Sequence, residues 1–151
     1  MDSDTHDFQI FAGTLRHALD AKNRVTVPSR WRRGETEEFY AIADPRRPVV
    51  VLLPAAELRR MNCEIEALGD LSVSQKRAFT RQLFAQAQPC PVDKQGRLVL
   101  PQEFCSRFSF EDEVVLAGTG TRIEIFRPED WEETCRKERE AFIQGSHSLG
   151  L

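Results

Sequence analysis

The chain has 151 residues, of which 40% are hydrophobic and 30% charged, and its formal net charge is −3. This balance is typical of a soluble globular protein, and the length suits one compact domain or two closely packed halves. No apolar run approaches the roughly 20 residues of a membrane span, and residues 1–7 lack the features of a secretory signal. We therefore expect a cytoplasmic protein with no membrane partner.

The first half of the chain predicts short strands separated by turns. Residues 24–27 alternate between polar and apolar side chains, which indicates a strand with one buried face. Pro28 favours the start of a helix, and Gly34 is a natural end for it. In chain order we expect a strand near 11–19, a turn at 20–23, a strand at 24–27, a helix at 29–33, and a hairpin of 39–43 and 49–53.

Helices and a second set of strands follow. Apolar residues recur at helical spacing in 55–68, in 74–87, and after Pro128, where Trp131, Cys135 and Phe142 share one side. Their plainest interpretation is packing in the core or between subunits. The second half predicts strands at 97–100, 114–117 and 122–126, with a Gly-Thr-Gly turn at 118–120. The chain beyond 144 has little to pack against.

The two halves resemble each other. Residues 20–28 align with 93–101, and both contain the pattern D-x-x-x-R, three strand-like residues and a proline. A second pair of prolines, Pro54 and Pro128, follows in the same order, which indicates duplication rather than coincidence. Neither half has enough apolar residues for a core of its own, so we expect both to share one. We divide the chain into an N-terminal extension (1–10), a first repeat (11–72), a second repeat with a linking helix (73–144), and a flexible tail (145–151).

Each copy of the motif predicts a tight turn that displays an arginine. The aspartate carboxylate can accept backbone N–H bonds and hold the loop. The residue before the arginine is Asn or Gly, both of which tolerate positive φ, so we expect a left-handed conformation there. The arginine itself, Arg24 or Arg97, can pair with the aspartate or reach phosphate or guanine. The turn-shaping residues are Asp20, Asn23, Asp93 and Gly96.

Cations gather around the first turn. Six basic residues lie between positions 16 and 33, where Asp20 is the one acid, whereas acids concentrate at 35–38 and 129–140. Such a distribution attracts a polyanion to one face of an acidic protein. Two plainer interpretations stay open: the Asp–Arg pairs only hold the fold, and the arginines at 30–33 only solvate a helix. The candidate DNA-contacting residues are Arg16, Lys22, Arg24, Arg30, Lys94 and Arg97.

Other classes of function find less support. The four cysteines form no CxxC pair, so a metal site would need long-range convergence, and we expect reduced thiols instead. No Gly-rich phosphate loop or nucleophile context is present, and we expect no catalytic residue, cofactor or small-molecule substrate. The main alternative to DNA binding is a protein-interaction module, antitoxin-like or a ring-forming scaffold, whose acidic C-terminal helix would be the natural contact surface.

The two motifs carry a resemblance to a known family. Residues 11–28 resemble the opening of MraZ proteins, whose motif is a DxKGR hairpin followed by a strand and a proline. Residues 92–101 resemble the second D-x-x-x-R copy, and the resemblance runs to about residue 142. It implies an α+β fold with a mainly β core: a pseudo-symmetric double-split β-barrel of AbrB type, built from two tandem repeats with flanking helices.

The resemblance also implies a function. MraZ proteins are sequence-specific, DNA-binding transcriptional regulators of the bacterial division and cell-wall gene cluster. This implies a nucleoid-associated protein that binds promoter direct repeats in double-stranded DNA as a ring or other homo-oligomer. Carried over by position, the DNA-contacting residues are Lys22, Arg24 and Arg97. Two departures from the family pattern are Asn23, which replaces a glycine, and the extension before Phe11.

Overall fold

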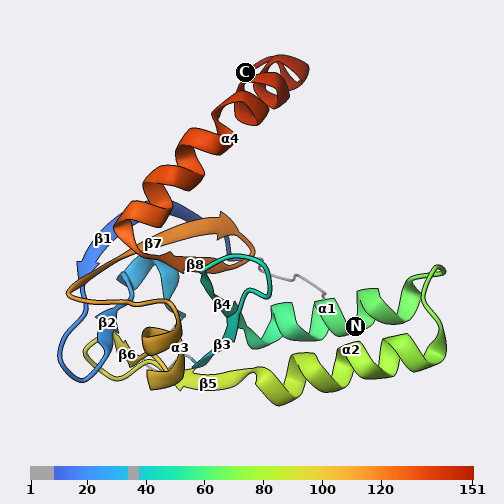
Figure 1. Ribbon diagram of the computed structural model, residues 1–151, viewed down its shortest axis with the longest axis horizontal. Helices are drawn as coiled ribbons and strands as arrows, with labels where there is room; N and C mark the ends of the chain where they lie inside the picture. The colour runs from blue at the N-terminus through green and yellow to red at the C-terminus, as the bar shows by residue number, and fades with distance from the viewer. Residues whose placement is uncertain (1–8, 34–37) are drawn as a thin grey trace.

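Strands from both halves of the chain alternate in one antiparallel sheet. The computed structural model describes residues 9–33 and 38–151 and has an α+β fold (Figure 1). The predicted extension at 1–10 therefore lies outside the described residues as far as residue 8. In chain order the elements are β1 (Phe11–Ala18), β2 (Arg24–Thr26), the 3-10 helix η1 (Ser29–Trp31), β3 (Glu38–Ala43), β4 (Val50–Pro54), α1 (Ala55–Ala67), α2 (Val73–Gln86), β5 (Gln88–Pro91), β6 (Arg97–Val99), α3 (Gln102–Arg107), β7 (Glu113–Gly120), β8 (Ile123–Phe126) and α4 (Pro128–Leu149).

The strand order is symmetric between the halves. Six strands lie in the order β1-β7-β8-β4-β3-β5, and β2 pairs with β6 in a separate two-stranded ribbon. Exchanging β1 with β5, β3 with β7 and β4 with β8 reverses this order and leaves every neighbour unchanged. The pairs β1–β7, β4–β8, β3–β5 and β2–β6 each join one half to the other. Most strand pairs therefore form between the halves, so that neither half could keep its sheet alone.

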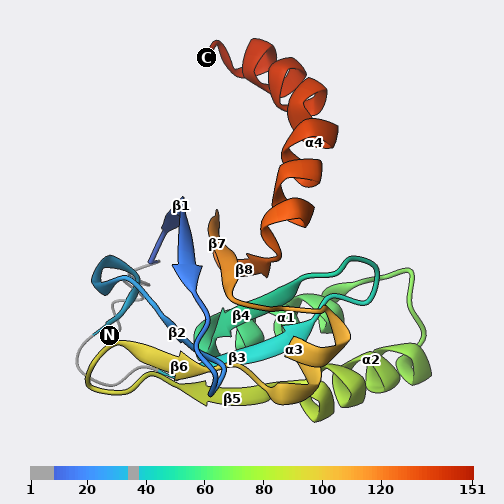
Figure 2. The same ribbon diagram turned by 60° about the vertical axis from the view of Figure 1, so that its left-hand side comes forward.

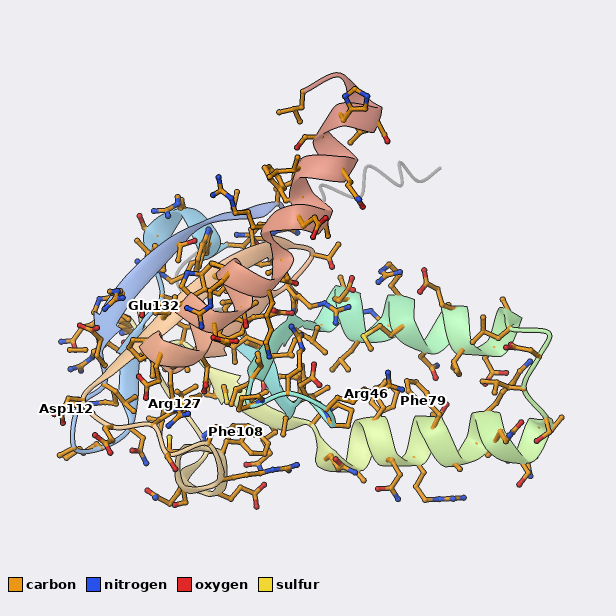
Figure 3. The ribbon with its side chains drawn as sticks, turned by 45° about the horizontal axis from the view of Figure 1, so that its top comes forward. Arg46, Phe79, Phe108, Asp112, Arg127 and Glu132 are labelled. Carbon is orange, nitrogen blue, oxygen red and sulfur yellow. The ribbon has the colours of Figure 1, made fainter. Side chains whose placement is uncertain are left out.

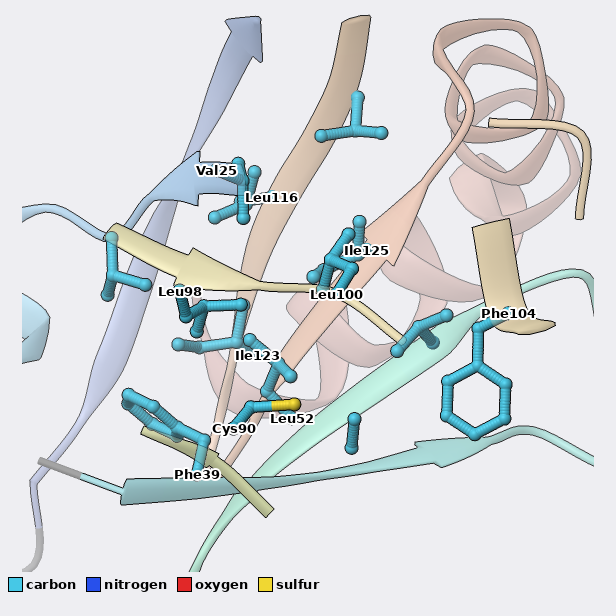
Figure 4. Close-up of a cluster of buried hydrophobic side chains, with 14 of the residues drawn as sticks. Val25, Phe39, Leu52, Cys90, Leu98, Leu100, Phe104, Leu116, Ile123 and Ile125 are labelled. Atoms are coloured by element: carbon cyan, nitrogen blue, oxygen red, sulfur yellow. The ribbon is translucent and has the colours of Figure 1, made fainter. Parts of the chain in front are cut away.

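The sheet is buried on both faces at its centre, which explains the two continuous apolar runs in the sequence. Alternate residues of β4 and β7 enter two separate clusters: Leu52 and Leu116 lie in the larger one, Val51 and Val115 in the smaller one. The larger cluster lies between the sheet and the ribbon and includes residues of both halves (Figure 4). The smaller one is covered by α1, α2 and the start of α4, which contribute Leu58, Leu83 and Trp131.

The helices project from the sheet in two directions. Helices α1 and α2 form an antiparallel pair, and α4 leaves the sheet at a steep angle to them (Figures 1 and 2). A capping box begins α2: Ser72 Oγ accepts a bond from the Gln75 N–H (3.1 Å), and Gln75 Oε1 accepts one from the Ser72 N–H (2.8 Å). Within the described ranges, no helix is long and apolar enough to cross a membrane.

Three local predictions differ from the structure. The turn expected at 118–120 lies at Thr121–Arg122 instead, because Gly118 is a β7 residue paired with Gly13 of β1. A Cβ on Gly118 would lie 2.5 Å from the backbone carbon of Phe11, so this glycine permits a close strand approach. The helix expected at 29–33 is the single turn η1, since the backbone is already extended at Arg32. The tail expected at 145–151 is helical to Leu149.

Candidate nucleic-acid interface

The β2–β6 ribbon places the two motif arginines on one face. Its register pairs Arg24 with Val99, Val25 with Leu98, and Thr26 with Arg97. Val25 and Leu98 are each 1% exposed and face the core, so the alternating residues Arg24 and Arg97 lie on the opposite face. The side chains of the two arginines are 31% and 33% exposed. Two residues of register separate them along the ribbon, which is about 7 Å.

The first turn is organised by the carboxylate of Asp20. Its Oδ1 accepts bonds from the N–H groups of Lys22 (2.9 Å) and Arg24 (2.8 Å), and its Oδ2 accepts one from Arg24 Nε (2.6 Å). The bond from the Arg24 N–H is the main reason that the pKa of Asp20 lies below its usual value. The carboxylate therefore stays ionised and fixes one edge of the guanidinium. The two terminal nitrogens of Arg24 bind no residue in the described part of the chain.

The second turn repeats this geometry with one difference. Asp93 Oδ1 accepts bonds from the N–H groups of Gln95 (2.9 Å) and Arg97 (2.9 Å), and the bond from the Arg97 N–H is the main cause of a lowered Asp93 pKa. Arg97 Nε lies 3.4 Å from Asp93 Oδ2, an ion-pair distance without hydrogen-bond geometry. Instead, a terminal nitrogen of Arg97 donates to the Gln95 side chain. Arg97 thus has one of its two terminal nitrogens engaged, whereas neither terminal nitrogen of Arg24 is, among the described residues.

The left-handed position predicted in both turns is confirmed. The φ angle is 60° at Asn23 and 83° at Gly96. The carbonyl of each of these residues accepts a bond from the other half: Asn23 O from the N–H of Leu100 (2.8 Å), and Gly96 O from the N–H of Val27 (2.8 Å). The left-handed residue thus ends its own turn and extends the ribbon. Both turns are held by the same core that holds the strands.

The segment after each proline crosses to the turn of the other half. Arg32 donates from Nε to Val27 O (3.0 Å), and its guanidinium lies over Gly96, where a Cβ would be 2.8 Å from Arg32 Cζ. Conversely, Gln102 Oε1 accepts a bond from Asn23 Nδ2 (2.6 Å). Arg32 was expected in the cluster of cations around the first turn, whereas in the structure it lies over the second turn. No pattern in the sequence predicted this contact, because Arg32 and Gly96 are 64 positions apart.

The other predicted cations have different environments. Lys22 and Lys94 are exposed at the tips of their turns. Arg30 is exposed after β2 and stacks over the Trp31 ring at 5.2 Å. Arg16 lies on β1 and pairs with Glu113 (3.2 Å) and with Glu132 of α4 (2.8 Å). Figure 3 labels Glu132 on helix α4. Arg16 is therefore already bound to two carboxylates.

The cysteines are all free thiols, as far as the chain is described. Cys63 and Cys135 are exposed, whereas Cys90 and Cys105 are buried. Burial raises the pKa of Cys90 to about 11, which makes it an inert core residue. Within residues 9–33 and 38–151, no three histidine, cysteine or acidic side chains gather as metal ligands.

Comparison with known proteins identifies the family. Residues 83–149 match the family described as "MraZ protein, putative antitoxin-like". The "Transcriptional regulator MraZ" of Symbiobacterium thermophilum is 33% identical over 92% of this chain and 99% of its own. The proteins of that name from Carboxydothermus hydrogenoformans (35%, over 88% and 92%) and Pediococcus pentosaceus (33%, over 93% and 96%) are similar to the same extent. Because a third of the residues agree over nearly the full length of both chains, the chain belongs to the MraZ family of transcriptional regulators.

Proposed function

We propose that this chain binds double-stranded DNA sequence-specifically through the β2–β6 ribbon. The observation that carries the proposal is the pair of arginines, Arg24 and Arg97, on the outward face of a two-stranded ribbon. The DNA major groove is wide enough for such a ribbon, and arginine binds the O6 and N7 atoms of guanine through two parallel bonds. The ribbon is anchored on its other face by Val25 and Leu98, so it enters the groove as a rigid body.

The turn carboxylates support this role by orienting the arginines. Asp20 binds one edge of Arg24 and leaves the terminal nitrogens for a ligand, which lowers the entropy lost on binding. Lys22 and Lys94 at the tips are placed to contact phosphates, and Arg32 adds a cation beside the second turn. Arg30 is a reserve phosphate contact, whereas Arg16 would first have to leave Glu113 and Glu132.

Several finer features of the proposal come from the family resemblance. We propose that the sheet and the ribbon together make the double-split barrel of AbrB type, divided as 11–72 and 73–144. The regulator would act at the nucleoid in the cytoplasm, on promoter direct repeats of the division and cell-wall gene cluster. With a net charge of −3, the chain as a whole is not attracted to DNA over long range, so one protomer should bind weakly. A ring or other homo-oligomer would raise avidity by about 10²–10⁴ through simultaneous contacts.

The test is a titration of wild type, Arg24→Ala and Arg97→Ala on DNA with one, two and three repeats, each at two salt concentrations. We expect affinity to rise with repeat number, Arg24→Ala to abolish specific binding, and Arg97→Ala to weaken it less, because Arg97 shares a nitrogen with Gln95. Arg46→Ala is the matched control, since Arg46 is an exposed arginine at the β3–β4 turn. Affinity that is independent of repeat number, or wild-type binding by Arg24→Ala, would favour the protein-interaction module instead.

A further inference from the structure

Each turn of the ribbon meets a side chain that follows the proline of the other half, and the two side chains differ in charge. At the first turn, Gln102 Oε1 accepts a bond from Asn23 Nδ2 (2.6 Å), and Gln102 Nε2 donates to Ser106 Oγ (3.0 Å). At the second turn, the guanidinium of Arg32 lies against Gly96. A neutral amide therefore contacts the first turn, whereas a cation contacts the second.

The residue that corresponds to Arg32 in the second half carries no charge. Continuing the alignment of residues 20–28 with 93–101 places Cys105 at the position of Arg32. Cys105 is 4% exposed and belongs to the larger core cluster. It cannot supply a cation to the first turn, so the contact of Arg32 with the second turn breaks the pseudo-symmetry of the ribbon.

Arg32 is held at the end of the ribbon by one edge of its guanidinium. Its Nε donates to Val27 O (3.0 Å), and the N–H of Val27 donates to Gly96 O (2.8 Å). A Cβ on Gly96 would lie 2.9 and 3.1 Å from the two terminal nitrogens of Arg32. These nitrogens form no hydrogen bond or ion pair with any residue in 9–33 or 38–151. One edge of the guanidinium is therefore bound, and the other is available to a ligand.

Covering the glycine does not account for the charge of Arg32. Gly96 is the one buried residue of the turn at 93–96, and an uncharged side chain could cover it equally well. Arg32 is itself half-buried, and a charge removed from water costs free energy unless a partner of opposite sign binds it. With Arg32, the second turn has three cations and one acid, namely Arg32, Lys94, Arg97 and Asp93. This arrangement favours an anion as the missing partner.

The position of Arg32 favours a phosphate over a base. Arg24 and Arg97 lie on the outward face of the paired strands, whereas Arg32 lies against the turn, beyond the last paired residue of β2. In protein–DNA complexes, contacts to phosphate set the position of the protein on the duplex, and contacts to base edges carry the sequence information.

We propose that Arg32 binds a DNA phosphate beside the second turn and positions the ribbon on the duplex without reading a base. The inference rests on the proposed function and assigns one further residue to it. It differs from the expectation drawn from the sequence, in which the cations gather around the first turn, because a residue of the first half adds its charge to the turn of the second.

The test compares affinity, sequence discrimination and salt dependence. Wild type, Arg32→Ala and Arg24→Ala are titrated at several salt concentrations on two duplexes of equal length, one from the DNA upstream of the chain's own gene and one with its sequence scrambled. Loss of one phosphate contact should weaken the binding of Arg32→Ala to both duplexes by about tenfold at low salt, so the ratio of the two affinities stays constant. The slope of log affinity against log salt concentration should become shallower by about 1. Arg24→Ala should instead lose the affinity ratio.

Three variants separate the charge of Arg32 from its role in folding. Arg32→Lys keeps the cation and should keep the wild-type slope. Gly96→Ala keeps Arg32 but displaces its guanidinium, so its slope should match that of Arg32→Ala. Arg46→Ala, at an exposed position of the β3–β4 turn, should bind like wild type. Urea unfolding of each variant measures its stability, and a residue with a structural role alone would lower stability and leave the salt slope unchanged.

The outcomes distinguish this inference from the proposed function. Equal affinity of wild type for the two duplexes would refute sequence-specific binding and the inference with it. Specific binding by wild type together with an unchanged slope in Arg32→Ala would overturn the inference alone. A loss of the affinity ratio in Arg32→Ala would also overturn it, because Arg32 would then read a base.

Discussion

Replacement of Gly96 by alanine tests how the second turn is built. An L side chain at a φ of 83° costs about 1–2 kcal/mol, which for a chain of 151 residues lowers the melting temperature by about 2–8 °C. The new Cβ would also lie 2.8 Å from Arg32 Cζ. Because that atom is the far end of a flexible side chain, Arg32 should swing away at little cost in stability. The strained backbone at residue 96 should then determine the loss of stability, and the displacement of Arg32 should determine the loss of DNA affinity.

The assay is urea unfolding followed by circular dichroism at one protein concentration, with Asn23→Gly as the mirror variant. That change relieves the left-handed conformation but removes the bond from Asn23 Nδ2 to Gln102, so a loss below about 1 kcal/mol is expected. Gly96→Asn separates the two effects, since asparagine tolerates this φ but still displaces Arg32. A Gly96→Ala protein as stable as wild type, or an Asn23→Gly protein less stable than Gly96→Ala, would refute the reasoning.

Three further predictions concern the frame behind the interface and the two turns themselves. Gly118→Ala should destabilise by about 3 kcal/mol in urea unfolding, because its Cβ would meet the Phe11 backbone, and Gly120→Ala, with open space and strain only, should lose less. Burial raises the pKa of Glu57, but the bonds from Arg60 and Arg122 outweigh this effect and lower the pKa overall. Glu57→Gln leaves both cations without their carboxylate, so the free energy of unfolding should fall by about 2 kcal/mol. The carboxylates of Asp20 and Asp93, which order the two turns, have lowered pKa values, so their contribution to stability is complete above about pH 4 and is lost as the pH falls through the folded pKa. An Asp20→Asn, Asp93→Asn double variant should therefore lose less stability between pH 6 and pH 3 than wild type does. An equal loss in the two proteins would contradict this.

The sequence predicted the local features of the site well, because short-range chemistry determines them. An aspartate that accepts N–H bonds two and four residues later, and a left-handed residue before the arginine, are properties of the turn itself. The alternation at 24–27 likewise placed Arg24 on the outer face and Val25 in the core. These predictions needed no knowledge of the rest of the fold.

The sequence could not show which segments cross between the halves. The position of Arg32 over Gly96 depends on the β2–β6 pairing, which joins residues about 70 positions apart. Gly118 was misplaced for the same reason: a Gly-Thr-Gly segment is typical of a turn, and only the approach of β1 makes glycine necessary within β7. The helical end of α4 reflects a left-handed cap at Gly150, with a φ of 73°, whose effect outweighed the lack of packing.

The geometry of the ribbon determines how repeats in DNA would be counted. Arg24 and Arg97 of one chain are about 7 Å apart along the ribbon, so both fit within one groove segment and together read one site. Repeats on the same face of DNA are about 34 Å apart, several times that distance. The two halves of one chain therefore cannot occupy two repeats, and the internal duplication supplies one DNA-binding ribbon rather than two. A second repeat requires a second chain, so affinity should rise with repeat number in an assembly of two or more chains and should be independent of repeat number when the protein is a monomer.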